Sequence, residues 1–209
     1  MVASSSIYWE LLFNIIKLKE HICLCEGGFM NYSSDRLYFR EFNENDFGLL
    51  YSIYSNDKVM KYTYLDKYDR EEELRPYFEE ILKNNQEGTK RQAYEFAVFL
   101  LDGSFVGMAE IEINNKNEYG GIGEIGYYTL PSFWGNGYTT EIAKLLLDIG
   151  FRDIKLHRLY ARCNANNLAS KRVMEKIGMK KEGELRKVRF KEMEWVNEFS
   201  YGILLEEWK

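Results

Sequence analysis

The stretch that decides the fold runs from residue 124 to residue 141 and reads Glu124-Ile-Gly-Tyr-Tyr-Thr-Leu-Pro-Ser-Phe-Trp-Gly-Asn-Gly-Tyr-Thr-Thr-Glu141. Its first part suits a strand, and the glycine turn after Trp134 opens a helix, because apolar residues then recur at helical spacing as far as residue 149. Backbone N–H groups at a helix start bind anions, and glycines let the backbone approach a phosphate closely. The stretch therefore predicts a phosphate-binding turn. Taken alone, it is also typical of an ordinary turn before a surface helix.

The flanking sequence predicts an α/β protein with one mixed sheet. The dipeptide Asp102-Gly103 between two apolar runs is a strong hairpin signal, and Gly178 is a typical helix stop. We expect residues 114–120 to form a polar loop. The predicted strands cover 36–42, 94–101, 104–113, 122–130, 158–163, 180–190 and 195–205, and the predicted helices about 46–54, 70–84, 136–149 and 168–177.

Composition limits the class of protein. The chain has 209 residues, of which 45% are hydrophobic, and a net charge of -5, so we expect one globular domain over residues 30–209. No run of basic residues is present that would follow a phosphate backbone, so we expect no nucleic-acid partner. Three cysteines, an odd number, favour a reducing compartment, which indicates the cytoplasm.

Residues 1–29 differ from the rest of the chain. Their apolar run is broken by charged residues, so it predicts neither a membrane span nor a signal peptide. One hypothesis is a short amphipathic helix that lies on a partner surface. The other is a translated upstream sequence, with Met30 as the natural start.

Three ordered motifs carry a family resemblance: Glu124 to Pro131, then Phe133 to Glu141, then Asn167-Leu-Ala-Ser170 together with Glu175-Lys-Ile-Gly-Met179. Together they resemble the GNAT N-acetyltransferase superfamily, and closely its branch typified by ribosomal-protein alanine N-acetyltransferases. The resemblance implies a mixed, mostly antiparallel, splayed central sheet flanked by helices. It also implies an enzyme that uses acetyl-coenzyme A (acetyl-CoA) as co-substrate, and no metal, to acetylate a primary amine by direct attack. The alternative is a non-catalytic acyl-CoA-binding module with the same fold.

The resemblance also implies the residues that bind the coenzyme. Backbone N–H groups between Gly135 and Thr139 are expected to bind the pyrophosphate. The end of the preceding strand is expected to pair with the pantetheine arm like an added strand, next to a bulge at Gly126. The predicted coenzyme-binding residues are Tyr128, Thr129, Leu130, Trp134, Gly135, Asn136, Gly137, Tyr138, Thr139, Asn164, Asn167 and Ser170.

Two side chains are the predicted catalytic residues. An amine must lose a proton before it attacks, and Glu124 at the head of the splayed strand is our candidate for the general base. Glu110 and Glu112 are the alternatives, of which we expect only one to face the site. The resemblance nominates the Ser170 hydroxyl as the proton donor to the departing thiolate. We expect Cys163 to be a small buried hydrophobe rather than a nucleophile.

The amine acceptor is less well defined by the sequence. Selection is expected to depend on the loops at 56–70, 114–121 and 191–193. Tyr62, Tyr64 and Tyr68 suit either an amine pocket or simple packing, and we favour packing. A protein N-terminus is the first candidate by family analogy, and small-molecule amines stay open, as do a monomer and a homodimer.

Overall fold

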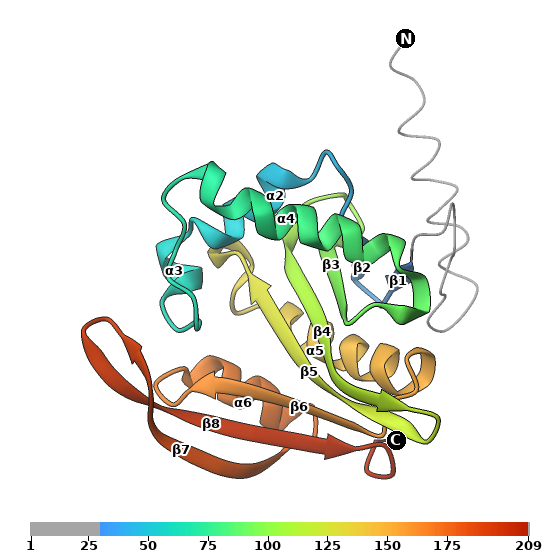
Figure 1. The fold of residues 1–209 in the computed structure, drawn as a ribbon. Helices are drawn as coiled ribbons and strands as arrows, with labels where there is room; N and C mark the ends of the chain where they lie inside the picture. Colours follow the sequence, from blue (N-terminus) through green and yellow to red (C-terminus); the bar gives the residue numbers. More distant parts are fainter. Residues whose placement is uncertain (1–29, 209) are drawn as a thin grey trace.

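One eight-stranded sheet organises residues 30–208, the part of the chain that the computed structural model describes (Figure 1). All neighbouring strands are antiparallel except β5 and β6, which confirms the predicted mixed, mostly antiparallel sheet. The strand order is β1-β2-β3-β4-β5-β6-β8-β7. The strands are β1 Asn31–Ser33, β2 Leu37–Glu41, β3 Ala93–Leu100, β4 Phe105–Asn117, β5 Gly120–Thr129, β6 Arg158–Asn164, β7 Lys180–Lys191 and β8 Glu194–Leu204.

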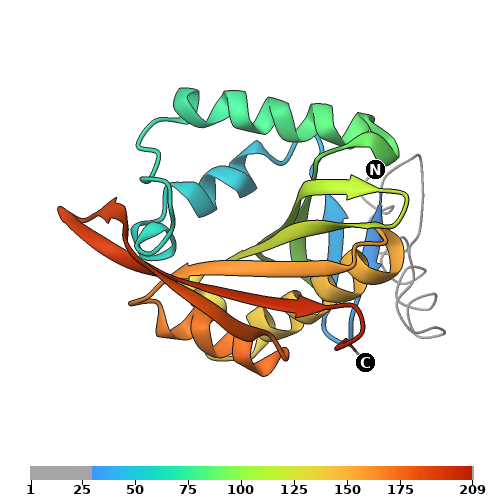
Figure 2. The same ribbon diagram turned by 60° about the horizontal axis from the view of Figure 1, so that its bottom comes forward.

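Helices cover both faces of the sheet (Figures 1 and 2). On one face lie α2 Phe47–Tyr54, α3 Asp57–Met60 and α4 Glu71–Gln86; on the other lie α5 Tyr138–Asp148 and α6 Leu168–Lys176. Successive side chains along the strands point to opposite faces of the sheet and so form two separate cores. Phe96 of β3 packs with α5, whereas Ala97 packs with α2 and α4. Short helical turns occupy Gly88–Lys90 and Pro131–Phe133, and a π-helical turn, Ile149–Asp153, extends α5.

The sheet parts between β5 and β6. The two strands pair only where Ile122–Glu124 meet Arg158–Tyr160, and beyond these positions neither strand pairs with the other. β6 continues to pair with β8 as far as Asn164, and β5 with β4 as far as Thr129. The predicted splay of the central sheet is therefore confirmed, and it leaves one edge of β5 open next to α5 and α6.

Two local predictions were wrong. Gly126 forms no bulge, because it pairs in regular register with Glu110; the irregularity lies on β4, between Ile113 and Asn115. The predicted loop over 114–120 is mostly strand, since β4 runs to Asn117 and β5 begins at Gly120. Polar residues there gave no apolar alternation, because this end of the hairpin is exposed along β4. The Asp102-Gly103 hairpin is confirmed, with Gly103 at a φ of 89°.

β1 and α3 were not predicted, because elements this short show no hydrophobic period. The predictions for residues 1–29 lie outside the described residues. No helix in the described part of the chain, residues 30–208, has the length and apolar character needed to span a bilayer.

Candidate active site

The turn from β5 into α5 leaves its backbone accessible. Gly135 and Gly137 adopt φ values of 80° and 81°, which favour glycine, and Gly137 caps α5 without a side-chain hydrogen bond. A Cβ at Gly135 would meet no atom within 4 Å, and one at Gly137 would meet only Arg36, at 3.7 Å. The N–H groups of the first helical turn therefore lie where an anion can approach them.

Side chains around the turn hold its shape. The Trp134 indole Nε1 donates to the Thr129 carbonyl at 2.8 Å, and the Asn136 amide donates to the Phe133 and Trp134 carbonyls at 3.3 and 3.2 Å. The Arg36 guanidinium donates to the Asn136 carbonyl at 3.1 Å. The Trp134 and Asn136 side chains thus fix the backbone of the turn, which positions its N–H groups in advance of a ligand.

A cavity of about 670 Å³ begins at this turn and passes through the gap beside β5 to the α3 side of the sheet. It brings together most of the predicted site residues. Leu130, Asn136, Tyr138 and Asn164 do not line it. The predicted residues that do line it are Glu124, Tyr128, Thr129, Trp134, Gly135, Gly137, Thr139, Asn167 and Ser170.

The four predicted residues outside the cavity have other partners. The N–H of Leu130 donates to the Val106 carbonyl, and the Asn164 side chain accepts from the N–H of Asn166, so both serve the local backbone. The Tyr138 ring packs under the Arg36 guanidinium at 4.6 Å. These contacts, like those of Asn136, are made within the protein and do not face the cavity.

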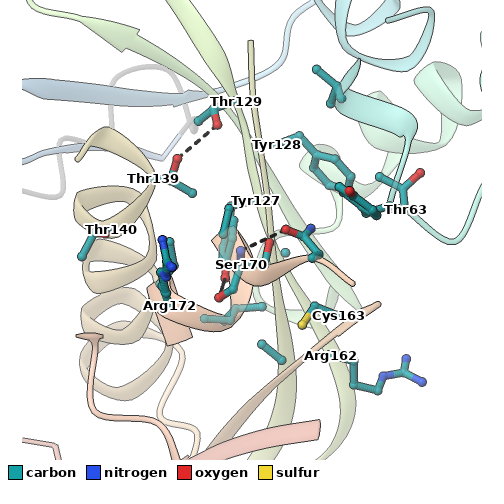
Figure 3. Close-up of a pocket in the computed structure, with 18 of the residues that line it drawn as sticks. Thr63, Tyr127, Tyr128, Thr129, Thr139, Thr140, Arg162, Cys163, Ser170 and Arg172 are labelled. Carbon is teal, nitrogen blue, oxygen red and sulfur yellow. Dashed lines mark hydrogen bonds between the residues drawn. The ribbon is translucent and has the colours of Figure 1, made fainter. Parts of the chain in front are cut away.

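On the α5 and α6 side of the gap, Tyr127 and Thr129 of β5 face the helices (Figure 3). The Tyr127 hydroxyl donates to the Ser170 carbonyl at 3.5 Å, and the Thr129 and Thr139 hydroxyls lie 3.1 Å apart. Asn167 caps α6 by accepting from the Ser170 N–H at 3.1 Å. This is the side that carries the open turn, so it is the side suited to a coenzyme.

Two basic residues of α6 that the motifs did not single out, Arg172 and Lys176, also line the cavity. They lie four residues apart on one face of α6, a spacing that is visible in the sequence once the helix start at Asn167 is known. Cys163 lines the cavity nearby, and burial raises the pKa of its thiol to about 12. A thiol that stays protonated fits the predicted inert role.

On the opposite, α3 side, three carboxylates face the cavity: Glu110, Glu112 and Glu124. Both oxygens of Glu124 accept hydrogen bonds from the Arg162 guanidinium, at 3.0 and 2.7 Å. The expectation that only one of Glu110 and Glu112 would face the site was wrong, because residues two apart on a strand point to the same side. Arg162 was missed, since its pairing joins residues 38 positions apart.

Glu110 lies deepest among these carboxylates. The Tyr128 hydroxyl donates to its Oε1 at 3.4 Å, and a Cβ at Gly126 would lie only 2.3 Å from that oxygen. Burial, together with the charges of Glu112 and Glu124, raises the pKa of Glu110 to about 7. No lysine, arginine or histidine among residues 30–208 forms an ion pair with Glu110. The site therefore contains a carboxyl that takes up and releases a proton near neutral pH.

Glu95 of β3 lies directly across from Glu110 in the sheet and is only 3% exposed. Burial, reinforced by the charge of Glu110, raises the pKa of Glu95 to about 8. Among the described residues, its Oε2 has no hydrogen-bond partner. Glu95 had no sequence signal, because a glutamate inside a strand pattern is ordinarily a solvated one.

The three tyrosines divide between the two predicted roles. Tyr68 packs edge-on against Tyr54, with ring centroids 6.0 Å apart. Tyr62 and Tyr64 line the cavity. The Tyr64 ring lies 3.9 Å from the Arg189 guanidinium and 5.4 Å from that of Arg162, so its cation–π contacts are made within the protein.

The residues of the cavity fit acetyl-CoA. The turn offers unhindered N–H groups for a pyrophosphate, Arg172 and Lys176 add positive charge, and the open edge of β5 lies beside a long cavity. Among residues 30–208, no cluster of three or more histidine, cysteine or carboxylate side chains is arranged to hold a metal ion.

Comparison with known proteins agrees with this geometry. An acetyltransferase (GNAT) domain model matches residues 36–180. An uncharacterized N-acetyltransferase of Bacillus subtilis, YnaD, is 34% identical over 181 residues, covering 86% of this chain and 99% of its own. The spermidine N(1)-acetyltransferase of Escherichia coli is 27% identical over 154 residues, covering 73% and 77%. The crystal structure of a GNAT-family acetyltransferase from Bacillus anthracis superimposes with a TM-score of 0.70 at 32% identity, covering 85% and 99%. The chain belongs to the GNAT acetyltransferase family, with the enzymatic activity that this family carries.

Proposed function

We propose that this protein transfers the acetyl group of acetyl-CoA to a primary amine by direct attack of the amine on the thioester. One observation carries the proposal: a single cavity joins the open turn at α5 to the carboxylates on the α3 side through the gap between β5 and β6. A coenzyme and an amine that enter from opposite faces of the sheet would meet in that gap. The cysteine content favours a cytoplasmic enzyme.

Acetyl-CoA, when bound, supplies an acetyl group that the thioester activates toward an amine. The N–H groups from Gly135 to Thr139 would hold the pyrophosphate, with Arg172 and Lys176 providing the positive charge. The open edge of β5 would pair with the pantetheine arm. The Thr129 carbonyl already accepts from Trp134, so the pairing would use the other backbone groups of this edge.

Glu110 is the general base that the geometry favours. A base must be ionised at working pH and have an oxygen free for the proton of the amine. Both oxygens of Glu124 are engaged by Arg162, whereas Glu110 has no cationic partner within residues 30–208 and titrates near neutral pH. We therefore propose that Glu110 removes the proton and that Glu124 fixes Arg162, with Glu124 kept as the second candidate for the base.

The departing thiolate requires a proton, and we assign this role to the Ser170 hydroxyl. Ser170 lies at the first turn of α6, on the coenzyme side of the gap, and lines the cavity. Tyr127 and Asn167 form hydrogen bonds with the backbone of Ser170, so they position this residue and leave its hydroxyl available for the thiolate. Cys163 stays a packing residue.

The acceptor is proposed to be a cationic amine. The α3 side of the cavity carries three carboxylates, which attract an ammonium group from water. The spermidine enzyme among the relatives supports a small-molecule amine. A protein N-terminus, the first candidate by family analogy, is the other acceptor to test.

The test is thiol release from acetyl-CoA with a panel of primary amines and short N-terminal peptides. We expect release only when an amine is present. Glu110→Gln should lower kcat by about 10²–10⁴-fold, as expected for loss of a general base, while acetyl-CoA still raises the melting temperature. Loss of activity in Glu124→Gln together with a normal Glu110→Gln would move the base to Glu124. Binding of acetyl-CoA without thiol release for any acceptor would indicate a non-catalytic module.

A further inference from the structure

Glu112 is the carboxylate of the cavity that the proposed reaction does not use. It is exposed, lines the cavity, and lies directly across from Glu124 in the ladder of β4 and β5. The charge of Glu124 is met by Arg162, but no basic side chain among residues 30–208 forms an ion pair with Glu112. A negative charge therefore faces the acceptor side of the cavity with no partner from the described chain.

Two other groups on this side, Tyr64 and Lys58, are unsuited to binding an ammonium group. The Tyr64 ring is already contacted by Arg162 and Arg189. Lys58, which lines the cavity from α3, repels a cation there. In the fold, α3 lies at the end of β4 and β5 away from the hairpin that joins them (Figure 1). An amine acceptor that extends from Glu110 therefore meets a favourable charge in the direction of Glu112.

The spacing of Glu110 and Glu112 defines the length of an acceptor that can reach both carboxylates. Residues two apart on a strand lie about 6.6–6.8 Å from each other and project from the same face. An extended chain of four carbons between two nitrogens has five bonds of about 1.5 Å, and its zigzag spans about 6 Å. One nitrogen can therefore lie beside Glu110 while the other lies beside Glu112.

We infer that the preferred acceptor is a short aliphatic diamine, whose second ammonium group binds Glu112 while its first amine reacts beside Glu110. The inference rests on the proposed function. The ammonium beside Glu110 gives its proton to that carboxylate, and the resulting amine forms the C–N bond as the C–S bond breaks. The second proton of the attacking nitrogen goes to the thiolate, through Ser170, so the products are an amide, a thiol and a protonated Glu110.

The experiment compares kcat/KM for 1,4-diaminobutane and n-butylamine, which share a reacting end and differ in the second ammonium group. We expect the diamine to be preferred about tenfold, the value of one charge-assisted contact in a partly exposed site. Across a series from 1,2-diaminoethane to 1,6-diaminohexane, the preference should be greatest at about four carbons, whose extended length comes near the spacing of the two carboxylates. Glu112→Gln should reduce the preference to less than about twofold, by lowering kcat/KM for the diamine.

The matched control is Glu118→Gln, which removes the same charge from the turn between β4 and β5, outside the cavity lining. It should leave the preference unchanged. Equal turnover of the two amines by the wild-type protein, or a preference that survives in Glu112→Gln, overturns the diamine inference alone. An N-terminal peptide with a higher kcat/KM than any diamine also overturns it. Absence of thiol release with every acceptor overturns the proposed function itself.

Discussion

The Gly126→Ala variant tests the position of the Glu110 carboxylate. A Cβ added at Gly126 would lie 2.3 Å from Glu110 Oε1, 2.8 Å from its Cγ and 2.9 Å from its Cδ. Ordinary contacts of this kind are about 3.5 Å, so the carboxylate must move by about 1 Å. The clashing atoms belong to a side chain that can rotate, and therefore the backbone of β5 can stay in place.

The expected cost falls on catalysis rather than on stability. A displacement of about 1 Å at a reacting group can lower a rate about 10²-fold. The free energy of unfolding should change by less than about 1.5 kcal/mol, since alanine recovers part of the backbone entropy that glycine loses in a strand. We therefore expect kcat to fall about 10²-fold while the shift in melting temperature on adding acetyl-CoA stays within about 1 °C of the wild-type shift.

The assay is thiol release at saturating acetyl-CoA, with urea unfolding of the same samples. Gly183→Ala is the control, because Gly183 also lies in a strand and a Cβ there would meet no atom within 4 Å. It should keep both activity and stability. Wild-type turnover by Gly126→Ala, alongside an inactive Glu110→Gln, would refute the link between the missing Cβ and the position of the base.

Other substitutions probe the remaining features. The pKa of Glu95 is about 8 in the folded state, against an ordinary 4.5, so the folded state holds this proton more tightly than the unfolded state. The contribution of the protonated Glu95 to stability is therefore full below pH 4.5 and is lost as pH rises through 8. Urea unfolding should show Glu95→Gln similar to wild type at pH 5 but more stable by about 2–4 kcal/mol at pH 9, and equal stability at both pH values would contradict this. Gly137→Ala, at a φ of 81°, should lower stability by about 1 kcal/mol and raise the KM for acetyl-CoA severalfold; an unchanged KM would argue against a role for this turn. Trp134→Phe removes the hydrogen bond to Thr129 and should cost about 1 kcal/mol in thermal unfolding, with no cost if the bond is absent in solution.

Local signals were enough to predict most of the fold. The turn at residues 134–137, the Asp102-Gly103 hairpin and the helical spacing after Tyr138 each specify a structure within a few neighbouring residues. The end of the β4–β5 hairpin was missed because polar strands exposed to water show no alternation. Gly126 was misread, since a glycine in a strand suits either a bulge or a close approach, and only the neighbouring strand decides between them.

The coenzyme half of the site was more predictable than the amine half for the same reason. Its backbone turn is formed by consecutive residues, so the sequence motif alone is enough to predict the geometry of the turn. On the amine side, the engagement of Glu124 by Arg162 and the burial of Glu110 opposite Glu95 both depend on strand order and register. These relationships join residues far apart in the sequence, and no single segment contains them.

The parting of β5 and β6 also divides the sheet by origin along the chain. Strands β1 to β5 come from residues 31–129 and β6 to β8 from residues 158–204, and only three residue pairs join the two blocks. In the first block all neighbours are consecutive strands, whereas in the second block β6 pairs with β8 and only β7 and β8 are consecutive. The hairpins β3–β4, β4–β5 and β7–β8 have short loops, whose closure costs little entropy. Joining the blocks requires the long connection through α5. The gap proposed for catalysis therefore lies where the strands from the two parts of the chain separate.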